Sequence, residues 1–293
     1  MSFLLIFNFC ITPVYYYIFD QGNLPAEKYE TLQTETTALM AEFKIAGEAG
    51  RVTPLRSIAD LIDTASQRGA KTLIACGSDD TFNQMLVALK GRDFVLGFIP
   101  FDPQSYLGKI LGIDSVFTGV KTIASRRIEK IDLAKIADNY FLSFLEFGVM
   151  SKEIKTAGFF SSLKLLSGDA KHIQIKIDNS YFLNLEALGG LLINTRATTA
   201  KNRSIANPTD SHLDLLILEK LSKTEIIKYR NLIAQGFLEQ VPKTTVIKCR
   251  KVEFLEPRGM HLTILGRIVA KLPTTVEIIP ERLRLIVGKN RTF

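Results

Sequence analysis

The stretch that decides the fold is Ala75-Cys76-Gly77-Ser78-Asp79-Asp80-Thr81-Phe82-Asn83-Gln84. It follows an apolar run at residues 71–76, which predicts a buried strand, and it precedes residues 82–89, which are expected to form a helix. A turn of small residues between a buried strand and a helix is where α/β proteins bind phosphate, because backbone N–H groups and the helix dipole favour an anion there. The stretch therefore predicts a nucleotide site. Its candidate binding residues are Gly77, Ser78, Asp79, Asp80, Thr81 and Asn83.

Residues 14–113 alternate between strand-like and helix-like segments on either side of this stretch. Strands are expected at 15–19, 45–52 and 94–99, and helices at 25–43, 54–68 and 105–111. Because strands and helices alternate, this part of the chain predicts a parallel sheet with helices on its faces.

The pattern changes after about residue 123, where short strand candidates follow one another closely. They are expected at 128–132, 139–148, 172–177, 181–185, 191–194, 213–218, 244–249, 252–255, 262–265, 276–279 and 283–287. A turn at 178–180 predicts a hairpin, and two helices are expected near 154–166 and 224–238. Short strands at this density predict an antiparallel β-sandwich.

The expected organisation is therefore two domains of different class. Residues 1–13 form an apolar leader, residues 14–122 an α/β domain of nucleotide-binding type, and residues 123–280 a β-sandwich of substrate-binding type. Residues 281–293 are a candidate to pack back on the first domain.

Charge and composition limit the partners. The chain has 293 residues, with 37 Lys and Arg against 30 Asp and Glu, so its net charge of +7 favours anionic partners or simply a solubilising surface. Basic stretches at 121–135 and 282–291 are candidates for contact with an anionic membrane, with ordinary solvated charge as the alternative. No basic and aromatic patch indicates nucleic acid. The three cysteines and three histidines show no zinc spacing and no catalytic triad, and the oligomeric state is not indicated.

The first 19 residues carry no charged side chain. A span of that length could cross a bilayer, but Asn8 and Pro13 interrupt it and no basic residue precedes it. We therefore expect a cytoplasmic protein, with membrane association or a transmembrane segment at 1–19 as the less favoured alternatives.

Several stretches, in order along nearly the whole chain, resemble the diacylglycerol kinase catalytic-domain family, which is more distantly similar to NAD kinases. The family carries Gly-Gly-Asp-Gly-Thr followed by x-Asn-Glu where this chain has residues 77–84. Its next motif corresponds without a gap to residues 97–113, its Asp-Gly-x-Leu-Asp turn to residues 210–214, and its closing strands to residues 275–287. The resemblance implies a lipid kinase-like, two-domain fold. It also implies ATP and Mg²⁺ as cofactors, with Asp79 and Asp214 as metal ligands.

The phosphate turn departs from the family motif, because Ser78 and Asp80 replace glycines. The added carboxylate would repel a phosphate. A metal ion bound by Asp79 and Asp80 would reverse the sign of the local charge and attract the phosphate instead. An alternative is that the turn survives for folding alone, with Thr81 capping the helix and Gln84 reaching back to complete a capping box.

Two further departures concern catalysis. Residues 102–106 replace Gly-Thr-Gly-Asn-Asp, and Pro103 removes a backbone donor there. Leu265-Gly266-Arg267 stands where the family carries Asp-Gly-Glu, so the position of the family's base is occupied by Leu265, which cannot accept a proton. Arg267 is a candidate phosphate contact, or else a solvated charge on a strand.

Near residues 19–23, where the family has a further phosphate loop, only Asp20 and Gly22 are usable. A substitute base would have to be Glu256, Asp214 or Asp79, and spacing supports none of them. Two functions follow. The first is ATP-dependent phosphoryl transfer to a lipid hydroxyl, and the alternative is a catalytically inactive pseudokinase that binds nucleotide, lipid or a protein partner.

Overall fold

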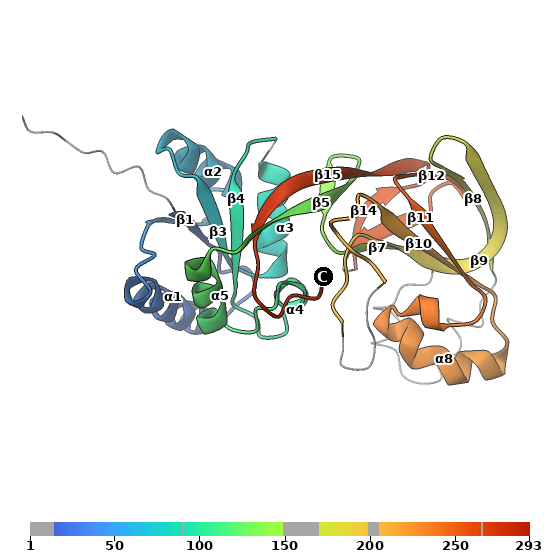
Figure 1. Cartoon of the computed structure of the whole chain (residues 1–293), viewed down its shortest axis with the longest axis horizontal. Helices are drawn as coiled ribbons and strands as arrows, with labels where there is room; N and C mark the ends of the chain where they lie inside the picture. The colour runs from blue at the N-terminus through green and yellow to red at the C-terminus, as the bar shows by residue number, and fades with distance from the viewer. Residues whose placement is uncertain (1–14, 90, 149–169, 199–204, 265) are drawn as a thin grey trace, which may run out of the picture. The chain divides into compact units, whose positions relative to one another are not determined.

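A computed structural model of the chain describes residues 15–89, 91–148, 170–198, 205–264 and 266–293 (Figure 1). The expected leader, the helix expected near 154–166 and Leu265 lie outside the described residues. The chain separates into two compact units. Unit 1 comprises the described residues up to Ser105 together with 114–128 and 286–288, and unit 2 comprises 106–113, the described part of 129–285, and 289–293. The domain limits expected from the sequence stay a prediction.

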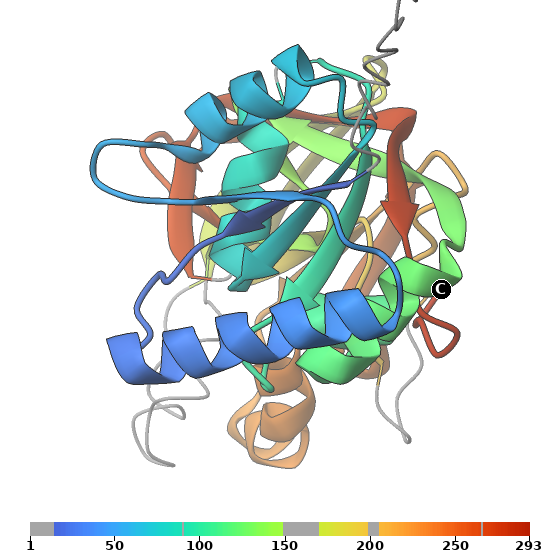
Figure 2. The same ribbon diagram turned by 90° about the vertical axis from the view of Figure 1, so that its left-hand side faces the viewer.

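Unit 1 is an α/β layered structure. Its strands are β1 (Tyr15–Phe19), β2 (Glu48–Arg51), β3 (Thr72–Gly77) and β4 (Val95–Pro100), and its helices are α1 (Ala26–Glu42), α2 (Ile58–Gln67), α3 (Asp79–Ala88) and α5 (Val116–Ser125). The strands pair in parallel in the order β4-β3-β1-β2. Figure 2 shows α1 and α5 on one face of this sheet and α2 and α3 on the other. The expected α/β class is confirmed.

Alternating side chains of β4 build the two faces of the unit 1 core. Phe98 meets Phe82 of α3 edge to face, with ring centroids 5.7 Å apart. Phe101, which follows β4 on the opposite face, meets Tyr29 of α1 at 6.0 Å. Helix α5 also approaches β4 closely, since a Cβ on Gly119 would lie 3.2 Å from the Cα of Ile99.

The order of these strands creates a topological switch point. The connection after β1 runs through α1 on one face, whereas the connection after β3 runs through α3 on the other face (Figure 2). In open parallel sheets, ligands bind outside the carboxyl ends of neighbouring strands whose connections diverge in this way. The carboxyl ends of β1 and β3 are therefore where unit 1 is expected to bind a ligand.

Unit 2 is built mainly from antiparallel strands. They are β5 (Ile128–Ile136), β6 (Asn139–Phe141), β7 (Phe144–Gly148), β8 (Lys171–Ile177), β9 (Tyr181–Ile193), β10 (Leu213–Glu219), β11 (Thr244–Cys249), β12 (Lys251–Glu256), β13 (His261–Ile264), β14 (Arg267–Lys271) and β15 (Thr274–Ile286). Helices α4 (Tyr106–Leu111) and α8 (Lys223–Gln235) and a 3₁₀ turn at Leu238–Gln240 complete it. The strands enclose one apolar core, with Phe147 and Phe254 in edge-to-face contact at 5.1 Å. The expected antiparallel sandwich class is confirmed.

Helix α8 covers a second, smaller apolar cluster (Figure 1). It begins at a capping box in which the Ser222 side chain accepts the Glu225 N–H and the Glu225 carboxylate accepts the Ser222 N–H. Its buried residues Ile226 and Ile233 belong to the same cluster as Leu191 and other side chains of β9 and β10.

A buried carboxylate ties together the loops of unit 2. Asp132 is 1% exposed, and its oxygens accept the backbone N–H groups of Ser211 at 2.6 Å and Glu281 at 2.8 Å. Both of these residues have positive φ angles, 61° and 47°, which cost energy for residues other than glycine. The Asp132 carboxylate therefore holds two strained backbone positions that are 70 residues apart in sequence (281 minus 211).

Among the described residues, the helices are too short or too polar to cross a membrane.

Candidate functional site

The turn between β3 and α3 is organised by Ser78 rather than by Thr81. Ser78 is the N-cap of α3, and its Oγ accepts the Thr81 N–H at 3.3 Å while the Ser78 N–H donates to Thr81 Oγ1 at 3.1 Å. The expectation that Thr81 caps the helix with Gln84 reaching back is therefore wrong. Helix α3 begins at Asp79, and Gln84 Nε2 instead donates to the Asp80 carboxylate at 2.8 Å.

Thr81 also joins the turn to the end of β1. Its hydroxyl donates to Asp20 Oδ2 at 2.7 Å, and the Thr81 side chain is wholly buried. The other carboxylate oxygen of Asp20 accepts the Gly22 N–H at 3.1 Å, so Asp20 holds the loop after β1 as well. The carboxyl ends of β1 and β3 are thus fastened to each other at the switch point.

Gly77 is required by this close approach. A Cβ at this position would lie 2.6 Å from Thr81 Oγ1 and 3.0 Å from the backbone oxygen of Asp20. Because real Cβ contacts do not fall below 3.0 Å, a side chain here would displace the Thr81 hydroxyl from its bonds.

The loop after β4 is attached to the same turn. The Phe101 N–H donates to the Gly77 carbonyl at 2.9 Å, and the Ser105 hydroxyl, which is 5% exposed, donates to the Asp79 carboxylate. Within the loop, the Gln104 N–H donates to Asp102 Oδ1 at 2.9 Å. Residues 102–105 therefore form an ordered wall of the site although Pro103 removes one donor.

Electrostatically, this helix start is mixed. The positive end of the helix dipole favours an anion, but the first turn of α3 carries Asp79 and Asp80. Their carboxylates and the neighbouring hydroxyls are hard oxygen donors of the kind that Mg²⁺ prefers. No group of three or more His, Cys, Asp or Glu side chains within the described ranges is arranged to hold a metal by itself. Mg²⁺ is usually held by one or two carboxylates together with substrate phosphates, so the residues present fit a metal that arrives with a nucleotide.

The other candidate residues belong to unit 2 or remain partly exposed. Asn83 lies partly exposed on α3, one turn after the cap. Arg267 is exposed at the start of β14, and the structure does not bring it together with the turn inside one unit. Its contact with phosphate stays a prediction.

Asp214, the second expected metal ligand, is a buried residue of β10. It is 2% exposed, and Lys248 Nζ lies 3.6 Å from its Oδ1. Burial raises the pKa of the Asp214 carboxyl, an effect that the neighbouring Lys248 partly opposes. Asp79 and Asp214 belong to different units, so a metal held by both stays a prediction.

Sequence reasoning missed how two residues act here. Asp20 was singled out only as a usable residue of an eroded loop, and Ser105 only as part of an altered motif. The bond between Thr81 and Asp20 joins residues 61 positions apart, and the bond from Ser105 to Asp79 joins residues 26 apart. The available signal was that each residue follows the carboxyl end of a predicted parallel strand.

The chain thus joins a parallel α/β unit, which has a polar turn at its switch point, to an antiparallel β unit. Residues 201–287 match the YegS C-terminal NAD kinase beta sandwich-like domain. The chain is 26% identical over 246 residues to a diacylglycerol kinase of Staphylococcus haemolyticus, covering 78% of this chain and 74% of that protein. It is 24% identical over 236 residues to a diacylglycerol kinase of Staphylococcus epidermidis, covering 74% of each.

Solved structures agree on the fold. A diacylglycerol kinase from Bacillus anthracis superposes with a TM-score of 0.73 at 16% identity, covering 94% of this chain and 97% of that one. An NAD kinase from Archaeoglobus fulgidus in complex with ATP superposes with a TM-score of 0.53 at 9% identity, covering 95% of each. The resemblance expected from the sequence is therefore confirmed: the chain is similar to bacterial diacylglycerol kinases in sequence and in fold.

Proposed function

We propose that this chain binds ATP at the turn between β3 and α3 and transfers its γ-phosphoryl group to a lipid hydroxyl. The observation that carries the proposal is the position of the turn. It lies at the switch point of the sheet, at the start of a helix, and is fastened to β1 by the bond from Thr81 to Asp20.

In this proposal the residues of the turn position the phosphates. Gly77 allows the phosphates to approach the backbone closely, and Thr81 fixes the turn to Asp20. Asp79 and Asp80 hold Mg²⁺ together with the nucleotide. The metal would neutralise charge on the phosphates, which is the main contribution to phosphoryl transfer besides positioning. Relatives named diacylglycerol kinase support a lipid acceptor. The expected contact with lipid or an anionic membrane surface belongs to this proposal.

The second candidate is a pseudokinase that binds nucleotide, lipid or a protein partner without turnover. Two observations favour it. Residues 265–267 stand where the resembled family carries Asp-Gly-Glu. Leu265 cannot act as a base, and Arg267 is always protonated. In addition, the N–H groups of Ser78 and Thr81 are already bonded to side chains of the turn, so they are not available to a phosphate unless the cap opens.

Transfer and binding can be measured separately. Purified protein is incubated with Mg-ATP and vesicles containing diacylglycerol, and label from the γ-phosphate is followed into lipid. In parallel, thermal unfolding is recorded with and without ATP, since a ligand that binds only the folded state raises the midpoint. Turnover with stabilisation supports the kinase, and stabilisation alone supports the pseudokinase. The absence of both contradicts the kinase and also a pseudokinase that binds nucleotide.

The role of Asp79 gives a sharper version of the binding test. Asp79→Asn should weaken the binding of Mg-ATP because it removes a metal ligand. The same substitution should strengthen the binding of ATP without Mg²⁺ because it removes a repulsive charge. Asp114→Asn, at the start of α5 in the same unit, is the matched control and should change neither affinity. Equal effects of the two substitutions would contradict a metal at Asp79.

A further inference from the structure

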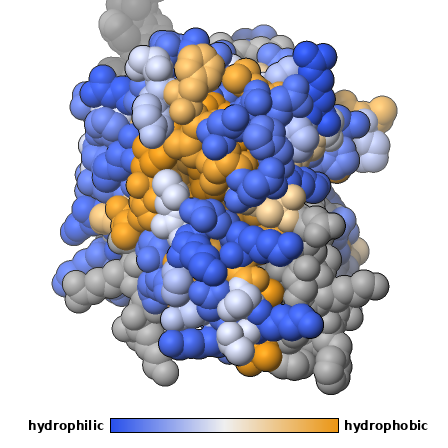
Figure 3. All heavy atoms as spheres, turned by 90° about the vertical axis from the view of Figure 1, so that its right-hand side faces the viewer, coloured by the Kyte–Doolittle hydropathy of each residue, from blue (hydrophilic) through white to orange (hydrophobic). Residues whose placement is uncertain are grey.

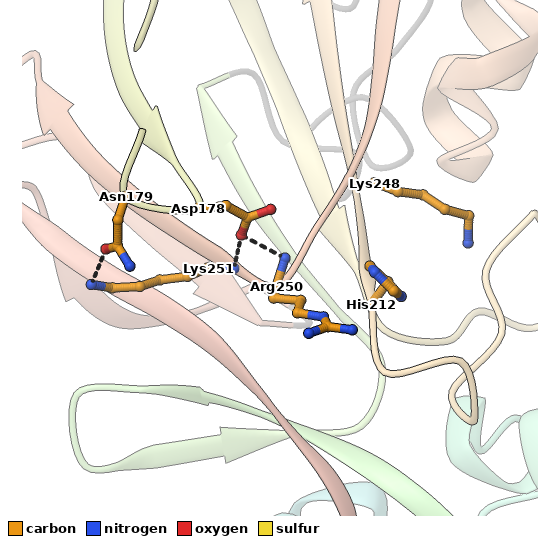
Figure 4. A pocket seen from close by; sticks show the side chains of 6 residues that line it. All are labelled: Asp178, Asn179, His212, Lys248, Arg250 and Lys251. Carbon is orange, nitrogen blue, oxygen red and sulfur yellow. Dashed lines mark hydrogen bonds between the residues drawn. The ribbon is translucent and has the colours of Figure 1, made fainter. Parts of the chain in front are cut away.

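A polar hollow lies in unit 2, at the corner between β11 and β12. Its lining residues come from the hairpin turn after β8, the loop before β10 and the corner itself: Asp178, Asn179, His212, Lys248, Arg250 and Lys251. Figure 4 shows Arg250 and His212 between Lys251 on one side and Lys248 on the other. Three of the six side chains are cationic.

His212 and Arg250 lie just beyond the last residue pair of the ladder between β10 and β11. Leu213 pairs with Cys249 and Asp214 with Lys248 in the antiparallel ladder, so the next residues outward are His212 and Arg250. Leu213 and Cys249 are buried, while Lys248, whose Nζ lies 3.6 Å from Asp214 Oδ1, lines the hollow together with His212 and Arg250.

The corner that carries Arg250 is rigidly held. Asp178 Oδ1 accepts the backbone N–H groups of Arg250 at 2.9 Å and Lys251 at 2.8 Å. The Asp178 N–H donates to the Lys251 carbonyl at 3.0 Å, and the Ile278 N–H donates to the Arg250 carbonyl at 2.9 Å. The one carboxylate that lines the hollow is thus engaged with backbone donors, and the backbone below the arginine is fixed from both sides.

The lining charges differ in how they are paired. Lys248 pairs with Asp210 at 2.6 Å, and Lys251 with Glu253 at 3.0 Å. In contrast, the exposed guanidinium of Arg250 makes no ion pair or side-chain hydrogen bond with any residue in the described part of the chain. His212 Nδ1 lies 2.6 Å from the Asp210 carbonyl and must donate to it, which leaves Nε2 as the ring atom available to a ligand.

We propose that this hollow binds a phosphate group, either free in solution or in the headgroup of an anionic lipid. The guanidinium of Arg250 supplies a planar fork that matches two phosphate oxygens, and His212 lines the same hollow. Asn179 and the two lysines line the same hollow, and both lysines are already paired with carboxylates. The site lies wholly in unit 2 and does not depend on the nucleotide turn.

The experiment uses the three histidines as reporters. Inorganic phosphate is titrated into the full-length protein at neutral pH, and the imidazole resonances of His172, His212 and His261 are followed by NMR. The His212 resonance is assigned with His212→Gln. We expect the His212 resonance to shift in a saturable way, while those of His172 and His261 stay unchanged.

Variants then test the arginine. Arg250→Gln should weaken phosphate binding about tenfold or more, because it removes a charge-assisted bidentate contact. Arg258→Gln is the matched control in the same unit, because Arg258 is exposed and pairs with Glu256. The proposal is overturned if all three histidines respond alike, if the His212 resonance does not shift, or if the two variants bind equally.

Vesicles distinguish the sources of the phosphate. Sedimentation is compared on vesicles of phosphatidylcholine alone and on vesicles with added phosphatidylglycerol. Stronger sedimentation of the wild type than of Arg250→Gln on the anionic vesicles assigns the site to a lipid headgroup. Equal sedimentation, together with the His212 response, assigns it to soluble phosphate.

Discussion

Replacing Thr81 with valine tests the contact that joins β1 to β3. Valine keeps the shape of threonine and removes only the hydroxyl. In the structure this hydroxyl accepts the Ser78 N–H at 3.1 Å and donates to Asp20 Oδ2 at 2.7 Å. Because Thr81 is wholly buried, water cannot take the place of the missing hydroxyl in these two hydrogen bonds.

The expected cost follows from these two bonds. A neutral hydrogen bond contributes about 1 kcal/mol and one to a charged group about 1.5 to 3 kcal/mol. Asp20 is partly exposed, so water can replace part of its loss. We therefore expect Thr81→Val to lower the free energy of unfolding by roughly 2 kcal/mol.

Thr118 offers an unusually close control within unit 1. It occupies the same position of a capping box, with Ser115 as N-cap of α5, and its hydroxyl donates to Asp114 Oδ1 at 2.8 Å. Thr118 is partly exposed and its acid lies four residues away, so this bond holds no second strand. Thr118→Val should cost under about 1 kcal/mol, the usual range for a capping contact.

Urea unfolding of both variants measures the difference, and ATP-dependent thermal stabilisation measures the consequence for binding. Thr81→Val should reduce the stabilisation by ATP, whereas Thr118→Val should leave it unchanged. If Thr81→Val costs no more than Thr118→Val, the bond to Asp20 does not fasten the switch point and the reasoning is refuted.

Three further outcomes are expected. Gly77→Ala should destabilise unit 1 by about 2 kcal/mol in urea unfolding, because its Cβ would lie 2.6 Å from Thr81 Oγ1; an unchanged midpoint would contradict the close approach. Asp132→Ala should cost roughly 3 kcal/mol by the same assay, because two backbone N–H groups lose a charged acceptor, and a cost below about 1 kcal/mol would argue against that role. Hydrogen bonds from Ser222, and to a lesser extent from Lys243, lower the pKa of Glu225 to about 2. The ionised Glu225 side chain therefore stabilises α8 fully at pH values above the ordinary pKa of a glutamate, and this stabilisation is lost as the pH falls towards 2. Carboxyl NMR measures that pKa, and acid unfolding of Glu225→Gln should lack this component; a normal pKa would contradict the capping box.

The sequence predicted the sheet of unit 1 well because its strands are marked by composition. Both β3 and β4 are continuous apolar runs bounded by turn residues, and both are completely buried. Helix α5 was not predicted, because Val116, Val120 and Ile123 favour strands and Gly119 disfavours a helix. The structure shows why a glycine is tolerated there, since a side chain would meet the backbone of β4.

In unit 2 most strands were predicted from the sequence, but the lengths of several of them were not. Strand β9 runs through residues 186–190, and β15 runs through Pro280 and Glu281, where the sequence predicted breaks. At Glu281 the left-handed backbone is held by Asp132, an acceptor 149 residues away in sequence. Strand β14 was missed because its short sequence carries no strong alternation of apolar and polar residues. Contacts between distant residues set these limits, so local patterns could not give them.

The site shows the same division between local pattern and topology. The sequence alone fits a capping box that starts at Ser78 as well as one that starts at Thr81. In the structure β3 ends at Gly77, so the helix begins directly afterwards and Ser78 is its N-cap. When Ser78 caps the helix, its hydroxyl accepts a backbone N–H of α3, which a glycine at this position could not do. The same bond occupies an N–H that a phosphate would otherwise use. Ser78 therefore adds a side-chain bond to the turn and leaves one N–H fewer for an anion. What still favours a ligand is position, because the capped turn remains at the switch point and remains fastened to Asp20. The measurement of ATP binding thus decides whether topology or the altered turn chemistry governs this site.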